Sequence, residues 1–365
     1  MGAHDRDTDS VDDGAFSPSD GLNRTDSRIR PRAPSTVPAD RISMRVPVSA
    51  IVARSTSLPR IAEYEWPSNT APITQSAEEA CNQIIARLAQ SEPEQAVRLT
   101  DQLLSMSDVG VTSLAPYFPG KLWRPAEDVK ALAIPARDIS PIAYAISRFD
   151  ARATNTMIEL LGSPNRETRL YAAIVSKDLD NPKLVFALAA VALDDDADGR
   201  HAALFAMSQH RRALSFTEAM LRFQRVASES EFDEIQRKRA ISALTQLRHE
   251  QSVPMLADLL FDSSPSIRKA SRLALRILTG HDFGYERSVW LSWLREHSRK
   301  PRILWLISAL GDHRIDLQHL ASVELYKATS QFLPPDRESA SIDAYRHLQS
   351  DYRTWWATEA QLRRS

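Results

Sequence analysis

The chain has 365 residues, of which 43% are hydrophobic, and its 46 Lys and Arg residues nearly balance its 47 Asp and Glu residues. This balance argues against a protein that coats nucleic acid by bulk electrostatics, although it leaves room for a local basic stripe. The single cysteine, Cys81, excludes an internal disulfide and a cysteine-based structural zinc site, and it is typical of a reducing, cytoplasmic compartment.

Several other classes of protein are excluded by missing motifs. The sequence has no run of about 18 apolar residues and no secretory signal at its start, so we expect no membrane association. It has no Gly-rich nucleotide loop, no H-E-x-x-H and no G-x-S-x-G, and its one His-Glu pair is His249-Glu250. We therefore predict no catalytic, cofactor-binding or metal-binding residues, and we expect the chain not to be an enzyme.

Residues 1–75 differ in composition from the rest of the chain. They are rich in Asp, Ser, Arg and Pro, and they show no sustained apolar periodicity. Such a segment cannot bury enough apolar surface to offset an ordering cost of about 1–2 kcal/mol per residue. The composition predicts a disordered N-terminal tail that acts as a tether or a second contact.

Helical patterns begin at residue 76, where Ser76 and Glu79 fit a capping box. Two helices are predicted to meet as a hairpin before residue 118, and an irregular, proline-containing insertion follows at 119–141. Trp123 and Arg124 lie in this insertion, and loops held by a rigid scaffold often carry binding residues. We take both as candidate partner-binding residues, with the alternative that Trp123 simply covers the end of the first hairpin.

After residue 141 four stretches share one frame: SPNRETRLYAA, DDADGRHAALFAM, EFDEIQRKRAISAL and SPSIRKASRLAL. Each places an arginine in the first turn of a helix, with arginine-to-arginine intervals of 31, 37 and 31 residues. An acidic residue, or Ser163 in the first unit, stands six positions earlier. We predict that each arginine bonds an acidic side chain of the adjacent turn and so forms a structural ladder. Its members are Arg169, Asp194, Arg200, Glu231, Arg237 and Asp262.

The frame D-x5-R-x-A-A-x2-A-L, with two helices per unit, resembles that of HEAT repeats. It covers residues 141–330 well and residues 77–118 more loosely. The block LTGHDFG with Trp290 and Trp293 resembles the closing units of uncharacterised bacterial HEAT-repeat proteins. The resemblance implies an all-α, right-handed, armadillo-like α-solenoid of about five to seven helical pairs over 76–365, with Trp-containing capping units at 278–365. It carries no known activity.

Basic residues gather on the second helices of the units, and Arg268, Arg272 and Arg276 are spaced to make a stripe on one helical face. We predict a scaffold that binds an unidentified protein partner along the concave face and loops, with this stripe among the contacts. The alternative is a nucleic-acid-binding solenoid that uses the same stripe. Acidic residues in the intervening turns favour a self-paired surface over a nucleic-acid groove. A third alternative, an enzyme on the same scaffold, requires a buried acid or His with a shifted pKa in a pocket.

Overall fold

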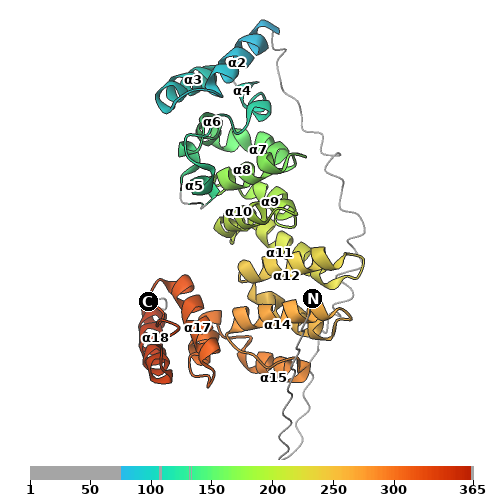
Figure 1. The fold of residues 1–365 in the computed structure, drawn as a ribbon, viewed down its shortest axis with the longest axis vertical. Coiled ribbons are helices and arrows are strands. Elements are labelled where there is room, and N and C mark those ends of the chain that lie inside the picture. The colour runs from blue at the N-terminus through green and yellow to red at the C-terminus, as the bar shows by residue number, and fades with distance from the viewer. Residues whose placement is uncertain (1–74, 107–108, 131, 133, 363–365) are drawn as a thin grey trace, which may run out of the picture. The chain divides into compact units, whose positions relative to one another are not determined.

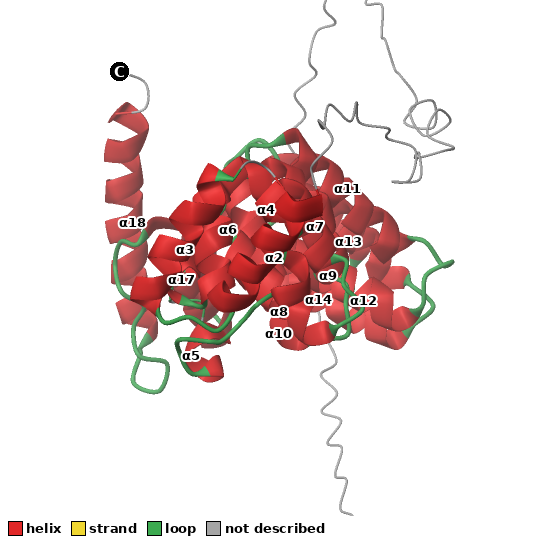
Figure 2. Ribbon diagram, turned by 90° about the horizontal axis from the view of Figure 1, so that it is seen from above, coloured by secondary structure: helices red, strands yellow, loops and turns green. Residues whose placement is uncertain are grey.

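The computed structural model describes residues 75–106, 109–130, 132 and 134–362, so the predicted tail, apart from Gln75, lies outside the described residues. Every regular element in these ranges is helical, which confirms the predicted all-α class (Figure 1, Figure 2). The N-terminal half contains α2 (Gln75–Leu88), α3 (Pro93–Ser105), α4 (Val109–Thr112), α5 (Ala126–Lys130), α6 (Pro141–Phe149), α7 (Thr154–Leu161) and α8 (Arg166–Ser176). Then follow α9 (Val185–Val191), α10 (Ala197–Met207), α11 (Leu214–Ser228), α12 (Glu234–Gln246) and α13 (Val253–Asp258). The C-terminal part contains α14 (Pro265–Thr279), α15 (Arg287–His297), α16 (Arg302–Ala309), α17 (Ile315–Thr329) and α18 (Ile342–Leu362).

The helices between α7 and α14 form a two-layered helical repeat. Each first helix packs on the second helix that follows it, in the pairs α7–α8, α9–α10, α11–α12 and α13–α14. First helices α7, α9 and α11 lie side by side in one layer, whereas α8 packs on α10, and α12 on α14, in the other (Figure 1). The pairs α2–α3 and α16–α17 extend the described part of the chain to a number of pairs within the predicted range.

A side-chain cap begins each of these second helices. Asn165, Asp196, Asp233 and Ser264 accept hydrogen bonds from the first backbone N–H groups of α8, α10, α12 and α14. All four stand four residues before a repeat arginine. A cap of this kind satisfies N–H groups that otherwise lack partners and contributes about 1 kcal/mol. The repeated frame therefore includes a polar cap that the sequence comparison did not isolate.

Alanine and leucine fill the space between the layers, and aromatic rings close the core near α15. Trp290 is fully buried, its ring centroid lies 6.4 Å from that of Trp293, and Trp293 lies 5.3 Å from Trp305. Trp293 is half-buried against the same core. These rings pack inside the repeat array, as is expected for large aromatic side chains at the end of a core.

Candidate binding groove between α10 and α12

The repeat arginines bind the turns that connect the units. Arg169 donates from Nε to Asp194 Oδ2 at 2.5 Å, and Arg237 pairs with Asp262 through both of its terminal nitrogens. In each case the carboxylate lies 25 residues further along the chain, in the turn before the next second helix. The structure therefore brings together two of the predicted arginine–aspartate pairs.

The middle pair of the predicted ladder does not form. Arg200 donates instead to the backbone carbonyls of Asp194 and Asp195, at 2.9 and 2.8 Å, and it has no ion pair among the described residues. Glu231 lies 3.6 Å from the Arg225 guanidinium. The predicted contact between Arg200 and Glu231 is thus absent from the structure.

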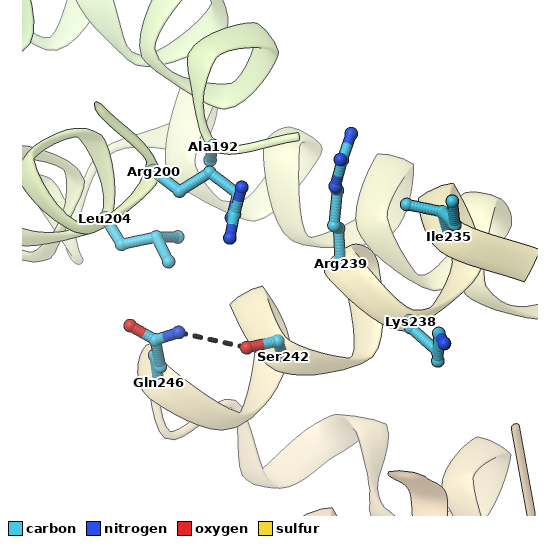
Figure 3. Close-up of a pocket in the computed structure, with 8 residues that line it drawn as sticks. All are labelled: Ala192, Arg200, Leu204, Ile235, Lys238, Arg239, Ser242 and Gln246. Atoms are coloured by element: carbon cyan, nitrogen blue, oxygen red, sulfur yellow. Dashed lines mark hydrogen bonds between the residues drawn. The ribbon is translucent and has the colours of Figure 1, made fainter. Parts of the chain in front are cut away.

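The physical reason is the longer interval at this point in the repeat. α11 is a continuous helix of 15 residues, whereas the first helices before and after it, α9 and α13, have 7 and 6 residues. The second helix that follows, α12, is thereby set away from α10. α8 packs closely on α10 and α12 packs closely on α14, but α10 and α12 stand apart with an open space between them (Figure 3).

This space is a groove with a cavity volume of about 210 Å³. Figure 3 shows Arg200 from the α10 side and Arg239 from α12 at the two sides of the groove, with the Gln246 amide bonded to the Ser242 hydroxyl at 3.0 Å. The full lining is Ala192, Arg200, Leu204, Ile235, Lys238, Arg239, Ser242 and Gln246. Three of these eight residues are cationic and none is acidic, so the groove wall carries positive charge.

The carboxylates nearest to these cations are exposed. Arg239 donates to the Leu193 carbonyl at 3.0 Å and to Asp195 Oδ1 at 2.8 Å, and the Asp195 side chain is 91% exposed. Lys238 lies 3.5 Å from Glu234 on the helix surface. Exposed pairs of this kind contribute at most about 1 kcal/mol, so both cations remain open to exchange with another anion.

The predicted basic stripe on α14 is arranged differently. Arg272 forms two hydrogen bonds of 2.9 Å to Asp282, and Arg276 lies 3.5 Å from the same carboxylate and donates to Asp316 at 2.6 Å. Arg268 donates to the carbonyls of its own turn, as Arg200 does. These contacts tie α14 to the following loop and to α17.

Asp282 is the centre of this network, and its side chain is buried. Burial alone would raise the pKa of Asp282, but hydrogen bonds from Arg272 and from the Gly284 N–H outweigh it. The pKa of Asp282 therefore lies below its ordinary value, and the group stays ionised at neutral pH. The stripe that the sequence marks as a binding surface is largely neutralised from within the chain.

Trp123 and Arg124 lie at the opposite end of the repeat from this network. The Trp123 ring is half-buried; its indole N–H donates to the Ser91 carbonyl at 2.9 Å, and its backbone N–H donates to Ile139. These bonds join the insertion to the first hairpin, which is the packing role that the sequence allows for Trp123. Arg124 is exposed beside it.

A second cavity, of about 460 Å³, lies where α5 approaches α8 and the start of α10. Ion pairs cross its lining, between Arg166 and Asp196 at 2.6 Å and between Lys130 and Asp198 at 3.4 Å. Small-molecule sites are lined mostly by apolar and aromatic side chains, which this cavity does not offer. Among the described residues no group of three or more His, Cys, Asp or Glu side chains is placed to hold a metal ion. None of the described helices has both the length and the apolar character to traverse a bilayer.

Comparisons with known proteins add little to this geometry. No family model matches the chain, and no curated protein matches it. One similar solved structure is a designed armadillo repeat protein in complex with the peptide (KR)4, at 14% sequence identity. It covers 67% of this chain and 98% of its own, with a TM-score of 0.28, which is too low to support any conclusion about the site. The helical-repeat fold rests on the packing described above, and the finer assignment to HEAT repeats or to bacterial proteins has no support from these comparisons.

The groove was not found from the sequence, although one signal for it was present. The basic residues of α12 were visible, but nothing singled out Lys238, Arg239, Ser242 or Gln246 from the other polar residues of the repeat. The interval of 37 residues between Arg200 and Arg237, against 31 on either side, is the feature that marks this place.

Proposed function

We propose that this chain is a non-enzymatic binding scaffold that holds another protein against its layer of second helices. The groove between α10 and α12 lies at the centre of the proposed interface. A layered helical repeat supports this role because each unit contributes a few side chains to one extended surface. The tail that precedes the repeat would act as a tether, and the proposed compartment is the cytoplasm.

The observation that carries the proposal is a row of exposed side chains at equivalent positions. Phe205 on α10, Ser242 on α12 and Leu273 on α14 each stand five residues after a repeat arginine, and all three are exposed. Phe205 is 41% and Leu273 55% exposed, and Ile235 at the groove edge is 55% exposed. Exposed apolar side chains around a charged groove are typical of a protein interface, in which aromatic and aliphatic anchors supply much of the affinity.

The nucleic-acid alternative loses the observation that favoured it. It relied on the α14 stripe, and Asp282 and Asp316 occupy Arg272 and Arg276. A protein that binds a phosphate backbone needs a track of cations that are free to displace counterions. We therefore keep a protein partner as the proposed function.

Site-specific photo-crosslinking tests this proposal. A photoreactive residue placed at Phe205 or Leu273 of the full chain, in cells of the source organism, is expected to capture one defined protein. The matched control is Leu221, which is 58% exposed on α11 in the other layer. Capture mainly at Leu221, or capture of nucleic acid at Phe205, would contradict a protein interface on the second helices.

A further inference from the structure

The groove between α10 and α12 has properties that specify what kind of segment it can hold. Its volume of about 210 Å³ is below the roughly 300–1,000 Å³ of a typical small-molecule pocket. A space of this size suits one or two side chains of a larger partner. Its floor combines apolar atoms of Ala192 and the buried Leu204 with the exposed Ile235 at the edge, so it can take up an apolar side chain.

The charged groups of the wall are arranged to receive carboxylates. Arg200 uses one terminal nitrogen for two backbone carbonyls, which leaves its other N–H donors without an ion-pair partner among the described residues. A guanidinium presents planar paired donors that match a carboxylate. Arg239 and Lys238 add two further cations, each bonded to an exposed acid that an incoming carboxylate can replace.

The surroundings of the groove favour separate carboxylate side chains over a continuous phosphate backbone. Asp194, Asp195 and Glu234 flank the cationic wall, and Asp195 is almost fully exposed. A polynucleotide that crossed the groove would have to pass these carboxylates, and nucleic-acid binding depends on many phosphate contacts in succession. An acidic side chain of a peptide can enter between the cations and leave the rest of the segment outside.

We infer that this groove binds an acidic segment of a protein partner, with Asp or Glu side chains against Arg200, Lys238 and Arg239 and a neighbouring apolar side chain over Leu204 and Ile235. The Ser242 hydroxyl and Gln246 amide supply a donor and an acceptor for the backbone of the segment. This inference rests on the proposed scaffold function and names the chemistry of its partner.

Fluorescence anisotropy with the full chain provides the test. The probe is a labelled peptide of repeated Glu-Glu-Leu, compared with the isosteric Gln-Gln-Leu peptide and with a single-stranded oligothymidylate. Lys238→Glu is the test variant, since Lys238 is 41% exposed and its change does not disturb the core. Lys269→Glu is the matched control, because Lys269 occupies the same position of the next unit, directly after the repeat arginine, and is exposed outside the groove.

We expect the Glu peptide to bind at least tenfold more tightly than the Gln peptide. Lys238→Glu is expected to weaken binding of the Glu peptide about three- to tenfold, and Lys269→Glu to change it less than about twofold. Equal losses in both variants would show general electrostatic attraction and overturn the inference. So would a lack of Glu-peptide binding, equal binding of the Gln peptide, or tighter binding of the oligonucleotide with loss in Lys238→Glu.

Competition separates this inference from the proposed function. The crosslink at Phe205 is repeated in the presence of the Glu peptide or the Gln peptide. Displacement of the captured protein by the Glu peptide alone supports both proposals. A protein that still crosslinks at Phe205 in excess Glu peptide leaves the scaffold function standing and overturns the acidic segment.

Discussion

The stripe on α14 and the groove between α10 and α12 are both built from arginines on second helices, yet their surroundings differ. On α14, Arg272 and Arg276 share the buried carboxylate of Asp282. At the groove, Arg239 has only the exposed Asp195, and Arg200 has backbone carbonyls alone. The buried carboxylate turns the first set into a structural joint, whereas the second set stays available. The number of arginines in a stretch of sequence therefore does not identify a binding surface, because the carboxylates around them decide what they do.

The largest expected effect follows removal of the shared carboxylate. Asp282→Asn leaves Arg272 and Arg276 close together without a counter-charge, and we expect a loss of about 2–3 kcal/mol in the free energy of unfolding, measured with urea. Breaking a fully buried pair typically costs about 3–5 kcal/mol, and the 35% exposure of the Arg272 side chain reduces this. The matched change at the groove, Asp195→Asn, should have little effect on unfolding. A similar loss in both variants would break the distinction between the two regions.

The same comparison has a pH dependence. The folded pKa of Asp282 lies below the value of about 3.9 for an unperturbed Asp, so its ionised form stabilises the fold above that value. This contribution is lost as the pH falls through about 4 towards the folded pKa. We expect the stability difference between wild type and Asp282→Asn to be full at pH 7 and to shrink below about pH 4. A difference that is constant down to pH 2 would contradict the role of this carboxylate.

Salt should separate the two regions further. Exposed charges are screened over about 8 Å at physiological ionic strength and over about 3 Å at 1 M, while buried pairs are screened much less. Binding of the Glu peptide at the groove is therefore expected to weaken several-fold between low and high salt. The unfolding difference caused by Asp282→Asn should change little over the same range. Equal salt sensitivity of the two measurements would contradict this description of the regions.

The smallest expected effect is a gain at the groove. Asp195→Asn removes the exposed carboxylate that bonds Arg239, so the guanidinium becomes more available to an incoming acid. We expect the Glu peptide to bind about twofold more tightly to this variant, measured by anisotropy. Asp258→Asn, which removes another exposed carboxylate paired with an arginine, Arg287, away from the groove, is the control and should leave the affinity unchanged. Weaker binding by Asp195→Asn would show that Asp195 helps to shape the site.

The sequence was sufficient to predict the class of fold and the frame of the repeat. Periodic apolar residues and the recurring arginine are local features, and they place the second helices and the turns between them. The pairing of Arg272 with Asp282 and of Arg276 with Asp316 is not local, since the partners lie 10 and 40 residues away on other elements. A helical stripe of three arginines therefore looked free when its partners were not yet in view.

The groove escaped prediction for a related reason. The frame assumed equal units, and on that assumption Glu231 stands where a partner for Arg200 is needed. The long helix α11 changes this spacing, so Glu231 lies beside Arg225 and Arg200 is left at an open space. Within this one chain, a departure from the repeat interval carried more information about the candidate site than the regular parts of the frame did.

Hydrogen–deuterium exchange of the full chain, with and without the Glu-Glu-Leu peptide, tests the central claim most directly. If the cationic groove binds acidic segments and the α14 stripe does not, peptide binding should slow exchange in 197–207 and 234–246. Exchange in 265–279 should stay as it is in the free protein. Protection confined to 265–279, or protection that spreads equally over the three segments, would contradict the assignment of the groove as the binding site.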